Sequence, residues 1–173
     1  MLSLIIGSIF LSNILVTNYL GIKIDKDSKI VLSLLTALIT FITSMVNYLI
    51  YNILNRYGFT YLKNLTFILT IIIISSLVLM IYKFIVDNDE DLLPKVVNNT
   101  LILGLSLIII STNYDYTKVL IYSISTCIGY IVIMFLIHYL NEELNKRKVP
   151  LSFKGYPIIL ITLGILLMVL SRL

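Results

Sequence analysis

Two short clusters of amide and hydroxyl side chains interrupt otherwise apolar stretches of this sequence. One cluster precedes Gly21, and the other lies between Pro94 and Gly104. The members are Ser12, Asn13, Thr17 and Asn18 in the first cluster, and Asn98, Asn99 and Thr100 in the second. Such side chains offer uncharged polar groups, which suit a cation or a small polar solute.

The composition indicates where these clusters lie. The chain has 173 residues, of which 59% are hydrophobic and 13% charged, and its mean hydropathy is +1.02. This leaves too little polar surface for a soluble globule, so we expect an all-α membrane protein. A helix that crosses the hydrocarbon needs about 20 apolar residues. The segments that serve as spans are 2–20, 29–54, 62–86, 94–111, 117–140 and 157–170. They fill nearly all of residues 1–173, which predicts a single membrane domain.

The second half of the chain resembles the first. Lys29 and Lys118, which open the second and fifth predicted spans, are 89 residues apart, and Lys63 and Lys154, which precede the third and sixth, are 91 apart. A near-constant shift indicates a duplication, with one repeat at about 1–86 and the other at about 94–173. Three spans per copy place the second copy upside down in the membrane. The alternative is that membrane spans resemble one another through shared composition.

The two polar clusters occupy corresponding places in the two repeats, in their opening spans. Asparagine clusters near Gly or Pro at such places are typical of broken helices, whose freed backbone lines a site near the middle of the membrane. We therefore predict that the first and fourth helices are broken. The candidate site residues are Asn13, Asn18, Gly21, Asn98, Asn99, Thr100 and Gly104. The alternative is that these side chains only hold helices together through hydrogen bonds.

Four segments carry a resemblance to a known family. They read NILVTNYLG at 13–21, LKNLTFIL at 62–69, LPKVVNNT at 93–100 and VPLSFKG at 149–155. Together they resemble the Rnf/Nqr membrane subunits, nearly from end to end. The last segment and the short length favour the branch of the A subunit of the Rnf complex, equivalent to the E subunit of the sodium-pumping NADH:quinone reductase.

The resemblance implies two inverted triplets of helices in the cell inner membrane, paired with a homologous subunit of opposite orientation. It also implies a larger complex that couples electron transport to the movement of Na⁺ or H⁺. In the family, each opening helix supplies one cysteine, and the two homologous subunits together hold a 2Fe–2S cluster. The corresponding positions here are Lys23 and Thr100. Neither residue replaces a thiolate as an iron ligand, so we expect no cofactor or metal bound by this chain alone.

Cys127 is the only cysteine, and it falls inside the fifth predicted span. A single thiol there cannot replace two missing ligands, and we interpret it as a small packing residue.

Three interpretations of function remain open. The chain is a divergent A-type subunit of a redox-driven ion-translocating complex, a small transporter or channel, or a structural membrane subunit without redox activity. A homo-oligomer is the alternative to a complex with other subunits. The sequence contains no Ser/His/Asp set, phosphate loop or metal-ligand spacing, so we predict no catalytic residues. No basic stripe with interleaved aromatics suggests a nucleic-acid partner.

The positive charges predict the orientation of the chain. Nine of the 13 Lys and Arg residues lie around the first, third and fifth connections between predicted spans. Short connections rich in Lys and Arg stay in the cytoplasm, so we expect both termini to be extracytoplasmic.

Overall fold

The structure, a computed structural model, describes residues 30–86, 92–112, 115–146 and 156–170. The helices in these ranges are α3 (Ile30–Arg56), α4 (Lys63–Val86), α5 (Leu93–Val97), α6 (Thr100–Ser111), α7 (Tyr116–Lys146) and α8 (Tyr156–Leu170), with a short 3-10 turn, η2 (Thr60–Leu62). Four stretches are long and apolar enough to cross a membrane: Val31–Arg56, Thr60–Ile85, Leu93–Ser111 and Tyr116–Leu140. The predicted all-α membrane class is confirmed. The predicted first span and its residues Asn13, Asn18, Gly21 and Lys23 lie outside the described residues.

These elements are helical because a helix satisfies its own backbone hydrogen bonds where no water is available. α3 ends where Gly58 adopts a φ of 76°, which a residue with a side chain rarely adopts. The Phe59 amide donates to the Leu54 carbonyl at 2.9 Å, and the Gly58 amide donates to the Asn55 carbonyl at 3.3 Å. This pair of bonds is a Schellman motif, which closes α3 so that the chain turns directly into η2 and α4.

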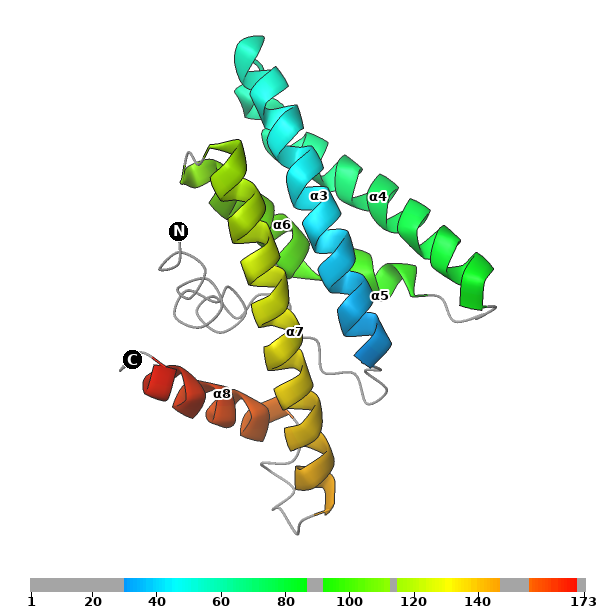
Figure 1. Cartoon of the computed structure of the whole chain (residues 1–173), viewed down its shortest axis with the longest axis vertical. Helices are drawn as coiled ribbons and strands as arrows, with labels where there is room; N and C mark the ends of the chain where they lie inside the picture. Colours follow the sequence, from blue (N-terminus) through cyan, green and yellow to red (C-terminus); the bar gives the residue numbers. More distant parts are fainter. Residues whose placement is uncertain (1–29, 87–91, 113–114, 147–155, 171–173) are drawn as a thin grey trace.

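α3 lies at the centre of the described bundle and packs against α4, α6 and α7 (Figure 1). Two apolar clusters surround it. One joins α3 to α6 and α7 through Leu105 and Tyr130, and the other joins α3 to α4, α5 and α6 through Ile39 and Ile102. α8 packs against α7. Polar residues buried between these helices are therefore held by contacts from several directions.

The fourth predicted span is broken, as predicted from the sequence. α5 and α6 together cover Leu93–Ser111, but Asn98 and Asn99 interrupt the helix between them. The fifth predicted span, 117–140, agrees with the membrane-spanning stretch Tyr116–Leu140, and α7 continues beyond that stretch to Lys146. A helix does not have to stop where the apolar composition stops, and its polar final turns extend the same hydrogen-bond ladder.

Candidate functional site

The break between α5 and α6 depends on the backbone and side chain of Asn99. Its backbone is extended, with φ −80° and ψ 110°, and its side-chain oxygen accepts a hydrogen bond from the Leu101 amide at 3.1 Å. This is the standard role of an asparagine that caps the start of a helix, where the first amides have no partner within the helix. On the other side of the break, the Asn99 amide donates to the Val96 carbonyl at 3.0 Å.

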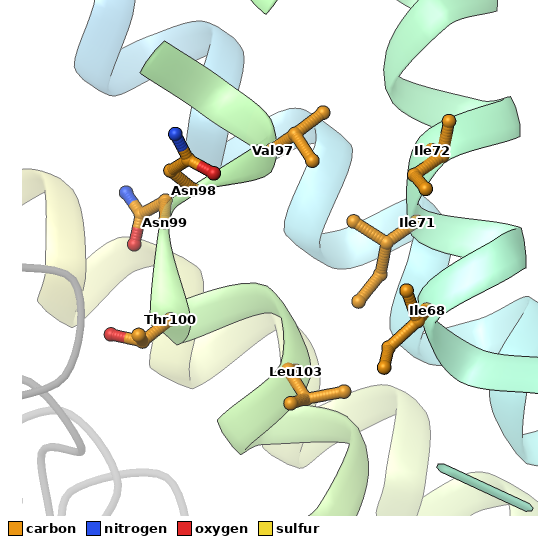
Figure 2. Close-up of a pocket in the computed structure, with 8 residues that line it drawn as sticks. All are labelled: Ile68, Ile71, Ile72, Val97, Asn98, Asn99, Thr100 and Leu103. Carbon is orange, nitrogen blue, oxygen red and sulfur yellow. The ribbon is translucent and has the colours of Figure 1, made fainter. Parts of the chain in front are cut away.

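The side chains around the break fall on two faces. Val97 and Leu103 point toward Ile68, Ile71 and Ile72 of α4, across a pocket of about 140 Å³ with an almost entirely apolar wall (Figure 2). The polar ends of Asn99 and Thr100 point away from α4 in the same view. The pocket beside the break is therefore mostly apolar, although Asn98, Asn99 and Thr100 also border it, and the polar ends of Asn99 and Thr100 lie on the side away from α4.

The structure brings together the predicted site residues of the fourth span. Asn98, Asn99 and Thr100 lie at the break, and Gly104 lies one turn inside α6. Asn99 is buried at 7% exposure, whereas Asn98 and Thr100 are exposed. The pairing of these residues with the cluster that precedes Gly21 stays a prediction.

Asn99 also contacts α7, through a residue that was not predicted from the sequence. Its side-chain nitrogen lies 3.3 Å from the hydroxyl oxygen of Tyr130, and that oxygen lies 3.3 Å from the Thr36 hydroxyl of α3. Tyr130 is 1% exposed and among the largest fully buried side chains. The break in the fourth span is thus linked to both α7 and α3 within the bundle.

A row of buried polar residues along α3 was also not predicted from the sequence. Its members are Thr36, Thr40, Thr43, Ser44 and Asn47, each at most 2% exposed. Each of them lies three or four residues from another member, which places them along one side of a helix. This spacing was the available signal, but Ser and Thr are common in membrane helices and their spacing does not identify a partner.

Asn47 joins three helices. Its side-chain nitrogen donates to the Ser106 hydroxyl of α6 at 2.9 Å, and its side-chain oxygen accepts from the Thr70 hydroxyl of α4. A second polar pair, Ser44 and Ser123, joins α3 to α7 at 3.1 Å. Lipid tails are as apolar as the side chains of membrane helices, so buried polar pairs of this kind act together with close packing to set which faces of the helices meet.

Three buried hydroxyls have no hydrogen-bond partner within the described ranges, namely those of Thr43, Ser75 and Thr126. Each belongs to a helix, where a rotation about χ1 brings the carbonyl of the preceding turn within reach. They therefore do not by themselves indicate a ligand.

Cys127 packs between α7 and α3, as the sequence analysis expects. The thiol is 8% exposed, and its sulfur lies 3.3 Å from the Ala37 carbonyl oxygen of α3. Clusters of at least three His, Cys, Asp or Glu side chains that could hold a metal are absent from the ranges that the structure describes.

The role of Asn99 as a cap predicts a selective effect of its removal. Asn99→Ala is expected to lower the free energy of unfolding by about 1 kcal/mol, because the Leu101 amide loses its side-chain acceptor. Asn98→Ala, at the exposed neighbouring position, is the matched control and is expected to change stability by less than about half of that. Equal losses in the two variants, measured by unfolding in bicelles, would contradict the capping role.

Comparison with known proteins agrees with this architecture. Residues 1–173 match the Rnf-Nqr family, described as "Rnf-Nqr subunit, membrane protein". The chain is 27% identical to the A subunit of the ion-translocating oxidoreductase complex of Aliivibrio fischeri, over 95% of this chain and 91% of that protein. It is 28% identical to the protein of the same name from Pseudoalteromonas translucida, with the same two coverages. The match over the full length, together with the membrane-spanning helices, shows that this chain belongs to the Rnf-Nqr family of membrane subunits.

Proposed function

We propose that this chain is a non-catalytic membrane subunit of a redox-driven ion-translocating complex, in the place that the A subunit has in its relatives. The observation that carries the proposal is the full-length family match, in which the relatives are named as subunits of an ion-translocating oxidoreductase complex. The broken fourth span supports it, because a break with polar groups near the middle of the membrane is a feature of ion-handling proteins.

This chain does not supply the ligands of an iron–sulfur cluster in our proposal. Thr100, at the family position of one cysteine, carries a hydroxyl, which is a hard and weak ligand for iron. The one thiol of the sequence, Cys127, lies on α7 in contact with α3 instead of at the break. The residues present at the break do not fit the cluster. The complex then either lacks this electron carrier or holds it on other subunits.

We also propose that the domain, residues 1–173, consists of two inverted repeats, at about 1–86 and 94–173. Hydrogen bonds between α3 and α7 support this. They pair Thr36 with Tyr130 and Ser44 with Ser123, so that residue numbers rise along α3 as they fall along α7. The corresponding second helices of two inverted repeats are expected to run in opposite directions in this way.

A groove between the same two helices gives independent support. It is lined by Leu34, Ala37, Leu38 and Phe41 of α3 and by Ile124, Cys127, Ile128 and Ile131 of α7. Each α3 residue has a counterpart on α7 at the separation of 90 residues that also separates Ala37 from Cys127. This separation lies between the shifts of 89 and 91 residues that relate the two repeats in the sequence. Two walls that correspond in this way are expected where a two-fold axis passes between copies, because equivalent residues then face each other.

The partners in this proposal are a homologous subunit of opposite orientation and further subunits of an Rnf/Nqr-like complex. We propose that both termini face away from the cytoplasm, because most Lys and Arg residues then lie on the cytoplasmic side. A partner of opposite orientation would place its own termini in the cytoplasm.

The proposal predicts the outcome of purification from native membranes. A tagged chain, extracted in mild detergent, is expected to bring down other oxidoreductase subunits. After it is separated from them in harsher detergent, the isolated chain is expected to contain no iron and to show no iron–sulfur absorbance. Its Cys127→Ala variant, which removes the only thiol, is the control for adventitious metal and is expected to give the same iron content.

Two results would contradict the proposal. A homo-oligomer free of other subunits would favour the alternative of a small transporter or channel, or of a structural subunit. Iron retained by the isolated chain and lost in Cys127→Ala would contradict the claim that this chain holds no cluster.

A further inference from the structure

Tyr130 occupies the middle of α7 and faces both the helix break and α3. Its hydroxyl oxygen lies 3.3 Å from Asn99 Nδ2 and 3.3 Å from Thr36 Oγ1. All three side chains are buried, at 1%, 7% and 2% exposure respectively. In this environment a lost hydrogen bond is not replaced by bulk water, so each of these bonds constrains geometry.

The direction of the hydrogen bonds follows from the donors and acceptors available. The Thr36 hydroxyl has backbone acceptors at Leu32 (2.8 Å) and Ser33 (2.9 Å), to which it donates its hydrogen. Its oxygen is then left to accept from the Tyr130 hydroxyl. Asn99 Nδ2 carries only hydrogens, so it donates to the Tyr130 oxygen. The chain of donation runs from Asn99 to Tyr130, then to Thr36 and the backbone of α3.

The other end of the Asn99 side chain is the cap of α6. Its Oδ1 accepts from the Leu101 amide at 3.1 Å. An amide group is planar, so a partner that fixes the nitrogen also fixes where the oxygen points. The Tyr130 hydroxyl therefore orients the group that starts α6, although Tyr130 belongs to a helix 31 residues further along the chain.

We propose that Tyr130 is a positioning residue that holds the break between α5 and α6 in its present form. Through its hydroxyl it keeps the Asn99 amide turned toward α6. Asn98 and Thr100 thereby stay at the exposed surface of the break. A role of this orientation in ion translocation rests on the proposed function. The orientation of the Asn99 amide itself is a property of the isolated chain.

Tyr130→Phe tests the proposal, since it removes the hydroxyl and keeps the ring in the core. The measurement is residue-resolved amide hydrogen exchange by NMR on the isolated chain in bicelles. We expect exchange at the Leu101 amide to be roughly threefold faster, the size of effect that one buried hydrogen bond between membrane helices gives. The Leu105 amide, one turn further along α6, is the internal reference and is expected to stay unchanged. A variant that merely loosens the bundle would change both amides together.

Ser123→Ala is the matched control, because it also removes a buried hydroxyl that joins α7 to α3. It has no bond to Asn99 among those that the structure gives for Ser123, so exchange at Leu101 is expected to stay at the value of the unsubstituted chain. Equal acceleration at Leu101 in Ser123→Ala and Tyr130→Phe would overturn the proposal, as would an unchanged rate in Tyr130→Phe.

Thr36→Val provides a second test should Tyr130→Phe fail to fold. It removes the acceptor that orients the Tyr130 hydroxyl and nearly preserves the volume of the side chain. Leu101 exchange is expected to accelerate less than in Tyr130→Phe. No change at Leu101 in Thr36→Val would count against the chain of donation. Because all of these measurements use the isolated chain, failure to find partner subunits in native membranes would leave their outcome unaffected.

Discussion

Asn47→Asp is expected to lower the free energy of unfolding by about 2 kcal/mol, one of the two largest effects that we predict for a single substitution in this chain. Asn47 is fully buried in α3, and its side chain bonds to both α4 and α6. The substitution preserves shape almost completely. It removes a donor and adds a negative charge in the hydrocarbon, where charged side chains are costly.

The neighbours of Asn47 are poorly suited to the new carboxylate. Thr70 can still donate to it, as it does to the amide oxygen. Ser106 already donates to the Ile102 carbonyl at 3.0 Å, so it must give up that bond to face a carboxylate oxygen. Either the carboxylate or the Ile102 carbonyl then goes without the Ser106 hydroxyl hydrogen, which adds to the cost of the charge.

Two companion variants separate charge from hydrogen bonding. Asn47→Leu removes both bonds without adding a charge and is expected to cost about 1 kcal/mol, because hydrogen bonds between membrane helices contribute little each. Asn52→Asp makes the same chemical change at an exposed position of α3 and is expected to have a much smaller effect. Unfolding by steric trapping in bicelles measures all three. Similar losses for Asn47→Asp and Asn52→Asp would show that burial of Asn47 is not what matters.

The helices themselves were largely predictable from the sequence. The predicted segments begin within one residue of α3, α4, α5, α7 and α8, since a long apolar run in a membrane has no alternative to a helix. The span predicted at 117–140 also ends where the membrane-spanning stretch Tyr116–Leu140 ends, while α7 itself continues with polar turns to Lys146. Apolar composition reports the thickness of the membrane and not the length of the helix.

The break in the fourth span was predictable for a local reason. Asparagine prefers a helix start to a helix interior, and Pro94 places another helix start close before it. Both signals are readable within a few residues.

The partners of the break were not predictable in this way. Tyr130 is one of 12 tyrosines, most of which lie near span ends. Its position in the sequence does not by itself show whether it lies at the membrane interface or in the core of the bundle. The contact with Asn99 depends on how α7 is rotated against α6. That rotation is set by the packing of many side chains at once, and no short segment contains it.

Ala37→Leu is expected to destabilise the bundle by about 2 kcal/mol. The cause differs from that in Asn47→Asp, because here the substitution adds volume instead of charge. Ala37 is 3% exposed at the contact of α3 with α7, where the Cys127 sulfur lies 3.3 Å from its carbonyl oxygen. Small residues at such contacts let two membrane helices approach closely. The added carbons of a leucine meet the close contact on one side and the groove that Ala37 lines on the other, and we expect the contact to be pushed apart or the rotamer to be strained.

The next residue supplies the control for Ala37→Leu. Leu38 is 47% exposed at the open groove between α3 and α7, so Leu38→Phe adds volume where lipid can make room. We expect it to change the free energy of unfolding by less than about 0.5 kcal/mol. The separation between the helices can be followed by spin labels placed on the exposed positions Ile53 and Tyr116 in a Cys127→Ser background, which removes the thiol and nearly keeps the size of the side chain at the contact. An increased separation is expected for Ala37→Leu alone.

If Ala37→Leu leaves both stability and separation unchanged, then the close contact at Ala37 and Cys127 does not determine how α3 and α7 pack. The correspondence of the two groove walls would then no longer support an axis between the repeats at this point.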